Sequence, residues 1–152
     1  MAKHKKQDDL EMNIPTVYEP ICEFESDVQL METAKWWIDR LSLNHWYFSI
    51  SIVPLSEMEM DDAVGENLMT YELNESVIHI AKFADVKTGV TKFCQEKVLV
   101  HELLHCLYNY LAQPNATYEG KFLDVQQHAR LEQMAKSLIM VKYGITSDWF
   151  NA

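Results

Sequence analysis

The chain has 152 residues, which suits one ordinary domain, because half this length would bury only a small core. Hydrophobic residues make up 48% of it and aromatic residues 11%, which excludes a wholly disordered chain. Its 13 Lys and Arg against 23 Asp and Glu give a formal net charge of −10. Because binding to a nucleic-acid backbone needs clustered cations, we expect no nucleic-acid partner.

The compartment is inferred from the cysteines and from the first residues. Cys22, Cys94 and Cys106 are too few, and odd in number, for a disulfide framework. The basic start at residues 3–6 is followed by the polar residues 7–11, where an export signal needs an apolar run. No stretch reaches the roughly 18 apolar residues of a membrane span. We therefore expect a cytoplasmic protein without a membrane partner.

The first part of the chain predicts an arm and a helix. Residues 1–26 are polar and contain two prolines, which is typical of an irregular N-terminal arm. Residues 27–152 are expected to form a single domain. Over residues 27–43 apolar side chains recur at helical spacing, and Ser26 or Asp27 can cap the helix.

Three strands are expected next. Residues 46–53 alternate aromatic and β-branched side chains up to Pro54, which predicts a strand. The acidic residues 56–62 are interpreted as a solvated, solubilising loop. Residues 68–73 and 76–83 predict two further strands, joined by a tight turn at residues 74–75.

Two helices complete the predicted fold. Residues 92–112 are apolar on nearly every side, which indicates a buried central helix. Residues 121–142 form the second helix, which Gly144 can end. The expected fold class is therefore α+β, with a helix, a three-stranded sheet and two packed helices.

The buried helix contains the sequence His101-Glu102-Leu103-Leu104-His105. Side chains four residues apart share a helix face, so both imidazoles can bind one metal ion. Glu102 is turned about 100° around the helix, which places it beside the ion as a general base for water. The structural alternative is a histidine pair that only makes hydrogen bonds, but three polar groups on an apolar helix suit a metal better.

The third ligand must come from another element. A catalytic zinc usually has three protein ligands and one open position, and the last helix offers His128 and Glu132. If the two helices form an antiparallel hairpin that turns at residues 113–120, His105 and His128 both lie about 8 residues from the turn, and Glu132 lies one 5.4 Å turn further. We therefore predict His101, His105 and His128 as metal ligands, with Glu132 as the alternative.

The His101–His105 motif and a second-helix pattern together resemble the small zinc metallopeptidases of phages and bacteria of the ImmA/IrrE type. The second pattern reads His128-x-x-Leu131-x-x-Met134-Ala135-x-x-Leu138-Ile139, and the resemblance covers about residues 76–140. It implies a zincin-like fold, Zn²⁺ as cofactor, a peptide or protein substrate, and a phage or prophage origin. It also implies that strand 76–83 is a sheet edge that binds substrate. This chain departs from the family in having His at position 128, where the family has Glu, and in lacking a later Pro.

We therefore expect a metallopeptidase in which Glu102 is the catalytic base. An oxyanion donor could be Tyr108 or Tyr118, and Asp124 could orient a ligand imidazole. The alternative function is an acidic binding or inhibitor module, in which the zinc site is structural or vestigial. Four protein ligands would distinguish that module from an enzyme, whose metal keeps an open position.

Overall fold

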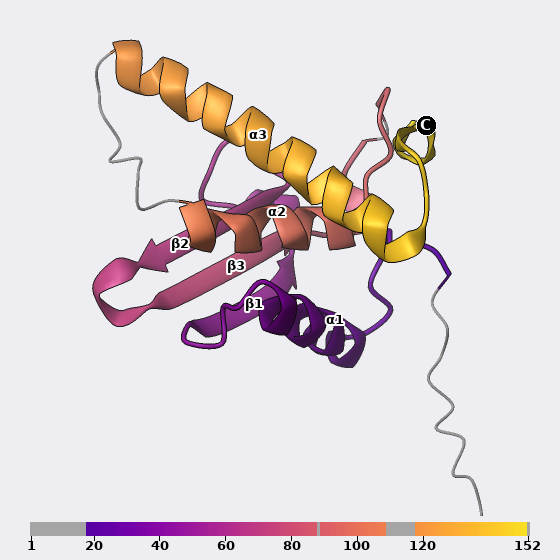
Figure 1. The fold of residues 1–152 in the computed structure, drawn as a ribbon, viewed down its shortest axis with the longest axis horizontal. Coiled ribbons are helices and arrows are strands. Elements are labelled where there is room, and N and C mark those ends of the chain that lie inside the picture. Colours follow the sequence, from indigo (N-terminus) through magenta and orange to yellow (C-terminus); the bar gives the residue numbers. More distant parts are fainter. Residues whose placement is uncertain (1–17, 88, 109–117, 152) are drawn as a thin grey trace, which may run out of the picture.

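The computed structural model describes residues 18–87, 89–108 and 118–151, and in the last range it describes side chains from residue 125 onward. Figure 1 shows a small sheet, two helices packed near it and a long third helix beyond them. The order of elements confirms the predicted α+β class. The helices and strands are α1 (Asp27–Arg40), β1 (Tyr47–Val53), β2 (Gly65–Thr70), β3 (Glu75–Ala81), α2 (Gln95–Tyr108) and α3 (Tyr118–Tyr143).

The ends of two helices follow from local sequence. The Ser26 side chain accepts a hydrogen bond from the backbone N–H of Gln29 at 3.1 Å, which caps the start of α1. At the other end of the chain Gly144 has a φ of 64°, the left-handed conformation that glycine adopts most easily. It directly follows α3, as the sequence predicted.

The strand order corrects one expectation. The sheet has the order β1-β3-β2, with β1 parallel and β2 antiparallel to β3. The segment expected at a sheet edge, residues 76–83, is therefore the central strand. The physical reason is that its side chains are the most deeply buried of the sheet: Ile78, Ile80 and Ala81 are fully buried, and β3 pairs with β1 on one side and with β2 on the other. The two edges are β1 and β2.

The second strand begins earlier than predicted. The expected strand 68–73 is observed as β2 from Gly65 to Thr70, and residues Tyr71–Leu73 form a 3₁₀ turn. Asn74 then adopts the left-handed conformation, with φ 50° and ψ 43°, and leads into β3. The start of β2 carries polar side chains that are satisfied by tertiary hydrogen bonds, so the apolar alternation that marks a strand is absent there.

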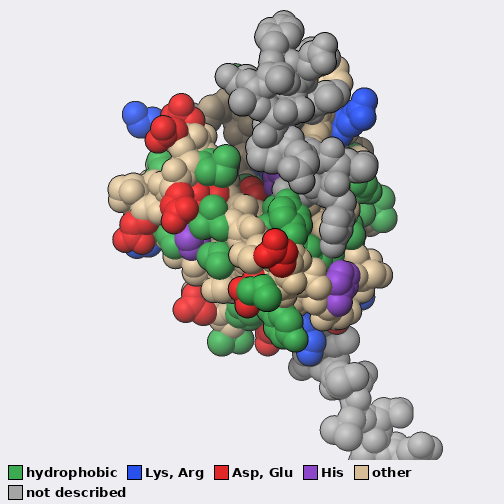
Figure 2. Space-filling model, turned by 90° about the vertical axis from the view of Figure 1, so that its left-hand side faces the viewer, with side chains coloured by type: hydrophobic (Ala, Val, Ile, Leu, Met, Phe, Trp, Pro, Cys, Tyr) green, Lys and Arg blue, Asp and Glu red, His purple; other side chains and the backbone are tan. Residues whose placement is uncertain are grey.

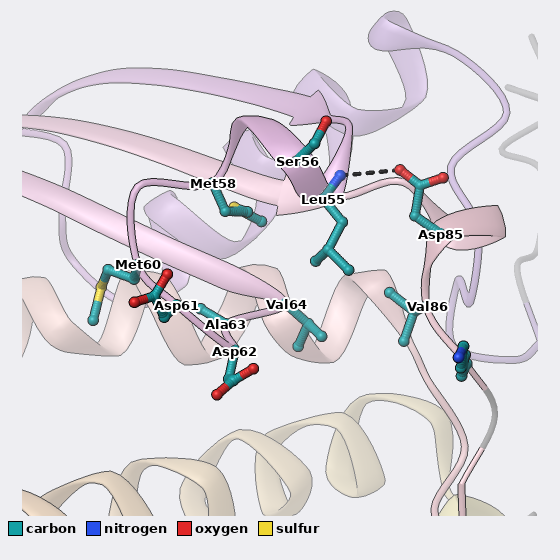
Figure 3. A pocket seen from close by; sticks show the side chains of 11 residues that line it. Leu55, Ser56, Met58, Met60, Asp61, Asp62, Ala63, Val64, Asp85 and Val86 are labelled. Carbon is teal, nitrogen blue, oxygen red and sulfur yellow. Dashed lines mark hydrogen bonds between the residues drawn. The ribbon is translucent and has the colours of Figure 1, made fainter.

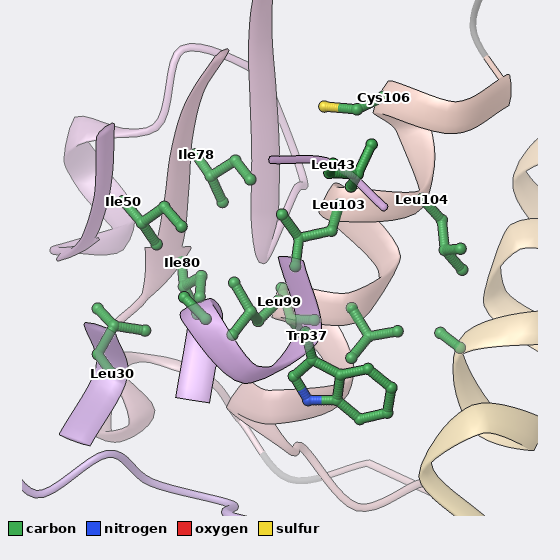
Figure 4. Close-up of a cluster of buried hydrophobic side chains, with 14 of the residues drawn as sticks. Leu30, Trp37, Leu43, Ile50, Ile78, Ile80, Leu99, Leu103, Leu104 and Cys106 are labelled. Carbon is green, nitrogen blue, oxygen red and sulfur yellow. The ribbon is translucent and has the colours of Figure 1, made fainter. Parts of the chain in front are cut away.

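The core lies between the sheet and α2 (Figure 4). Side chains of β3 and α2 meet there, with Ile78 and Ile80 on the strand and Leu99 and Leu103 on the helix, all fully buried. The other side of α2 packs against α3 (Figure 1), so α2 is buried on nearly every side. The predicted central position of this helix is confirmed. Among the described residues, no helix is both long and apolar enough to cross a lipid bilayer.

The first turn of α2 holds a buried carboxylate that connects four parts of the chain. Glu96 is completely buried and accepts hydrogen bonds from the indole N–H of Trp37 in α1 at 3.0 Å and from the backbone N–H of Ile21 at 2.9 Å. The Lys142 ammonium and the Tyr143 hydroxyl, both at the end of α3, donate to it at 2.6 Å and 2.7 Å. We call these five residues the Glu96 cluster.

The preceding residue makes a similar connection. The Gln95 side chain accepts from the backbone N–H of Phe24 at 2.7 Å and donates to the carbonyl of Ala81 at the end of β3 at 2.9 Å. The predicted N-terminal arm, residues 1–26, lies outside the described residues as far as residue 17. Its remaining residues contain no helix or strand, and these hydrogen bonds attach them to α2.

We expect Glu96→Ala to lower the free energy of unfolding by about 3–5 kcal/mol, because it leaves the Lys142 charge and three other donors without their acceptor. Urea unfolding followed by circular dichroism measures the loss. The matched control is Glu32→Ala on the exposed side of α1, which should change the free energy by less than about 0.5 kcal/mol. Equal effects of the two substitutions would contradict the role of the cluster.

Candidate metal centre

Three histidines from two helices come together on the side of α2 that faces α3. His101 and His105 lie on α2 and His128 lies on α3, and a ligand atom from each lies within 4.8 Å of the others. The ring centroids are 5.1 Å apart for His101 and His105, 5.2 Å for His101 and His128, and 4.9 Å for His105 and His128. His101 is buried, His105 is half-buried and His128 is exposed, so the group could hold a metal ion that solvent can reach.

The packing of α2 and α3 explains the meeting. The two helices lie side by side and run in opposite directions (Figure 1), as the register argument for His128 assumed. The predicted turn at residues 113–120 lies outside the described residues as far as residue 117, and α3 begins at Tyr118. Glu132 lies one turn further along α3 than His128 and contacts Lys97 and His101 on α2.

The electrostatic environment keeps one of these imidazoles neutral. Burial lowers the pKa of His105 to about 3, and the neighbouring His101 and His128 lower it in the same direction. A neutral imidazole has a free nitrogen lone pair, which is the form that binds a metal. Histidines this close repel one another when protonated, whereas a metal ion can be shared by all three. The donor set therefore fits a metal ion that prefers imidazole nitrogen.

Glu132 contacts both a histidine of the group and a lysine of α2. Its carboxylate accepts a hydrogen bond from Nδ1 of His101 at 3.1 Å, and it forms an ion pair with Lys97. Although burial opposes the change, the contacts with His101 and Lys97 lower the pKa of Glu132 to about 2. A carboxylate on Nδ1 fixes the ring and leaves Nε2 for a metal ion. The sequence treated Glu132 only as an alternative ligand and missed this orienting contact, which the position of Lys97 four residues before His101 could have suggested.

Glu102 lies between the histidines and the edge strand. Its side chain is 7% exposed, and Oε2 is 3.9 Å from Nε2 of His105. Burial raises the pKa of Glu102 to about 7, against the opposing effect of His101 and with a further contribution from the charges of Glu66 and Glu132. The carboxylate is therefore next to the histidine group, close to the position predicted for a base.

The edge strand β2 lies close to Glu102, and the residue at the point of contact is a glycine. A Cβ atom added to Gly65 would lie 2.8 Å from Oε1 of Glu102 and 2.3 Å from Cγ1 of Val98. Farther along β2, the side-chain amide of Asn67 donates to the backbone carbonyl of Glu102 at 2.8 Å, and Ser76 donates to Asn67 at 2.7 Å. These contacts fix β2 against α2. No pattern in the sequence indicates the role of either β2 residue.

The remaining candidates are placed as follows. The Tyr118 and Asp124 side chains lie outside the described residues. Tyr108 is 39% exposed at the end of α2, and Nδ1 of His79 lies 2.7 Å from the buried Glu66. His79 thus supports the buried Glu66 carboxylate.

Comparisons of the chain with protein-family models, with curated proteins and with solved structures find no match. The fold and the site alone therefore define the class of protein. It is an α+β protein whose last two helices carry a three-histidine group that could hold a metal ion.

Metal titration tests the ligands. With Zn²⁺ as the probe, we expect one ion per chain, and His101→Ala or His128→Ala should abolish measurable binding because three ligands are needed to hold it. Glu132→Ala should keep the stoichiometry and weaken affinity about 10–100-fold, the usual effect of losing a residue that orients a ligand. His45→Ala, at an exposed histidine before β1, is the control and should change neither. Loss of the ion in Glu132→Ala with retention in His128→Ala would make Glu132 the third ligand.

The contact between β2 and α2 is tested at Gly65. Gly65→Ala places a methyl group against Val98 and Glu102, which should lower the free energy of unfolding by about 1–3 kcal/mol. Gly89→Ala is the control, because an added Cβ there meets no atom within 4 Å. Urea unfolding compares the two variants, and equal stability would show that the strand can move away without cost.

Proposed function

We propose that this chain is a zinc-dependent hydrolase that cleaves peptide bonds. The observation that carries the proposal is a buried carboxylate, Glu102, next to three histidines whose ligand atoms lie within 4.8 Å of one another. Three imidazoles and an open position are the usual protein contribution to a catalytic zinc, whereas a structural zinc is closed by four protein ligands. Among the described residues, the group has three members.

Zinc, when bound, polarises the scissile carbonyl and lowers the pKa of water. The residues of the chain supply the metal ligands and the proton transfer. His101, His105 and His128 would hold the ion, and Glu132 keeps the His101 ring in the orientation that binding requires. Glu102 takes a proton from the attacking water and returns it to the leaving amine.

Two further points support a peptidase. The resemblance to the ImmA/IrrE type rests on the same two helices that build the histidine group. The gradation from buried His101 to exposed His128 leaves the group open to solvent on the α3 side, so a peptide or protein substrate can reach it. A cytoplasmic location and a phage or prophage origin belong to the same proposal.

We expect Glu102→Gln to keep the fold and the zinc and to lower the rate of hydrolysis by about 10²–10⁴-fold, since it retains the shape of the side chain and removes the proton acceptor. Digestion of a broad peptide library followed by mass spectrometry measures the rate. Glu72→Gln, at an exposed position on the turn after β2, is the control and should leave the rate unchanged.

Two outcomes would contradict the proposal. Cleavage that survives Glu102→Gln would remove Glu102 from the mechanism. A wild-type protein that cleaves no peptide and holds its zinc through four protein ligands would favour the binding or inhibitor module instead.

A further inference from the structure

A pocket of about 520 Å³ lies beside the start of β2. Its walls come from the loop between β1 and β2 and from the segment after β3. Figure 3 shows the side chains of Leu55, Val64 and Val86 close together in it, so the pocket has an apolar wall. Leu55 is 39% exposed and Val64 is 37% exposed, which means that this wall is accessible to a ligand.

The rim of the pocket is acidic. Asp61 and Asp62 lie toward one end of the pocket and Asp85 lies toward the other (Figure 3). Asp85 accepts a hydrogen bond from the backbone N–H of Leu55 at 3.0 Å, whereas no hydrogen bond or ion pair between described residues involves the carboxylate of Asp61 or Asp62. Lys87 is the one cation among the described residues that line the pocket. Two exposed carboxylates are thus available to a cationic ligand.

Hydrogen bonds to a buried glutamate fix the loop that carries these carboxylates. Glu66 is buried beneath it and accepts hydrogen bonds from the backbone N–H groups of Glu59 and Met60, at 2.9 Å and 3.0 Å. Glu66 is itself held by His79 at 2.7 Å. Because Asp85 holds the start of the loop and Glu66 holds its middle, the pocket is preformed.

The pocket lies beside the start of the strand that contacts Glu102. Val64 lines the pocket, and the next residue, Gly65, packs against the Glu102 carboxylate. A peptide whose scissile bond lies at Glu102 therefore has the pocket next to it along β2. On the face shown in Figure 2, Asp and Glu side chains lie among hydrophobic ones, and most Lys and Arg side chains lie near the margins.

We propose that this pocket binds a Lys or Arg side chain of the peptide substrate, flanked by apolar residues; the proposal rests on the proposed function. Both side chains have a long apolar stem and a cationic end. The stem would lie along Leu55, Val64 and Val86, and the cation would reach Asp61 and Asp62. A Glu at the same place would be repelled, and a neutral aliphatic side chain would gain only the apolar contacts.

The test measures binding separately from cleavage, on the zinc-loaded Glu102→Gln protein. Three acetylated and amidated peptides of sequence Ala-Leu-X-Leu-Ala, with X as Lys, norleucine or Glu, are titrated while backbone amide shifts are recorded by NMR. We expect the Lys peptide to bind about 5-fold more tightly than the norleucine peptide at low salt, with shifts in residues 55–64 and 85–87, and the difference to disappear at high salt.

Paired variants separate the pocket from the general charge of the protein. D61N/D62N should remove the preference for Lys, whereas E32Q/D39N on the exposed side of α1 changes the net charge equally and should keep it. Equal binding of the Lys and Glu peptides, shifts confined to other residues, or the same loss in both double variants would overturn the proposal.

Cleavage of the same peptides by the wild type distinguishes the two proposals. Binding of the Lys peptide in the pocket without any cleavage refutes the hydrolase and upholds the pocket as a binding site for basic peptides. Cleavage of all three peptides at equal rates upholds the hydrolase and refutes the pocket as its means of selecting a substrate.

Discussion

The position of α3 on α2 depends on a carboxylate that has been removed from water. A buried charge is costly unless hydrogen bonds compensate it, and Glu96 is compensated by donors from the N-terminal segment, α1 and α3. Its contact with Lys142 fixes the end of α3, and the contact of Glu132 with Lys97 and His101 fixes the middle of the same helix. Because α3 is fixed at its end and at its middle, His128 faces the two histidines of α2. The geometry of the three-histidine group is thus set in part by the ion pairs of Glu96 with Lys142 and of Glu132 with Lys97.

The buried carboxylates of the described residues divide into two kinds. Glu96 and Glu66 accept several hydrogen bonds each, and their role is to hold segments together. Glu102 is also buried, but no hydrogen bond between described residues reaches its carboxylate, and the neutral His105 lies 3.9 Å away. Its pKa is raised to about 7 for that reason, chiefly through burial. Such a group costs stability, which is expected where a side chain serves chemistry and not folding.

The parts of this structure that the sequence predicted are those with local causes. Helical spacing placed His101 and His105 on one face, and the count of residues from the turn selected His128 over Glu132 as the neighbour of both. The predictions for the start of β2 and for the place of β3 in the sheet were wrong, because both features depend on residues that are distant in the sequence. A glycine suits position 65 because the Glu102 carboxylate, 37 residues later in the chain, packs against it. A carboxylate can be buried at position 96 because three other segments donate hydrogen bonds to it. A single sequence carries no signal for such contacts.

The acidic loop shows how the same residues can have a general and a specific effect. From the sequence alone, residues 56–62 indicate only a solubilising surface, because exposed carboxylates make copies of a protein repel one another. In the structure Asp85 and Glu66 hold the loop, so its charges occupy fixed positions beside an apolar wall. Fixed charges discriminate between ligands, because a wrong ligand cannot move them away. The proposed selection of a cationic substrate therefore depends on the anchoring of the loop more than on the number of acidic residues in it.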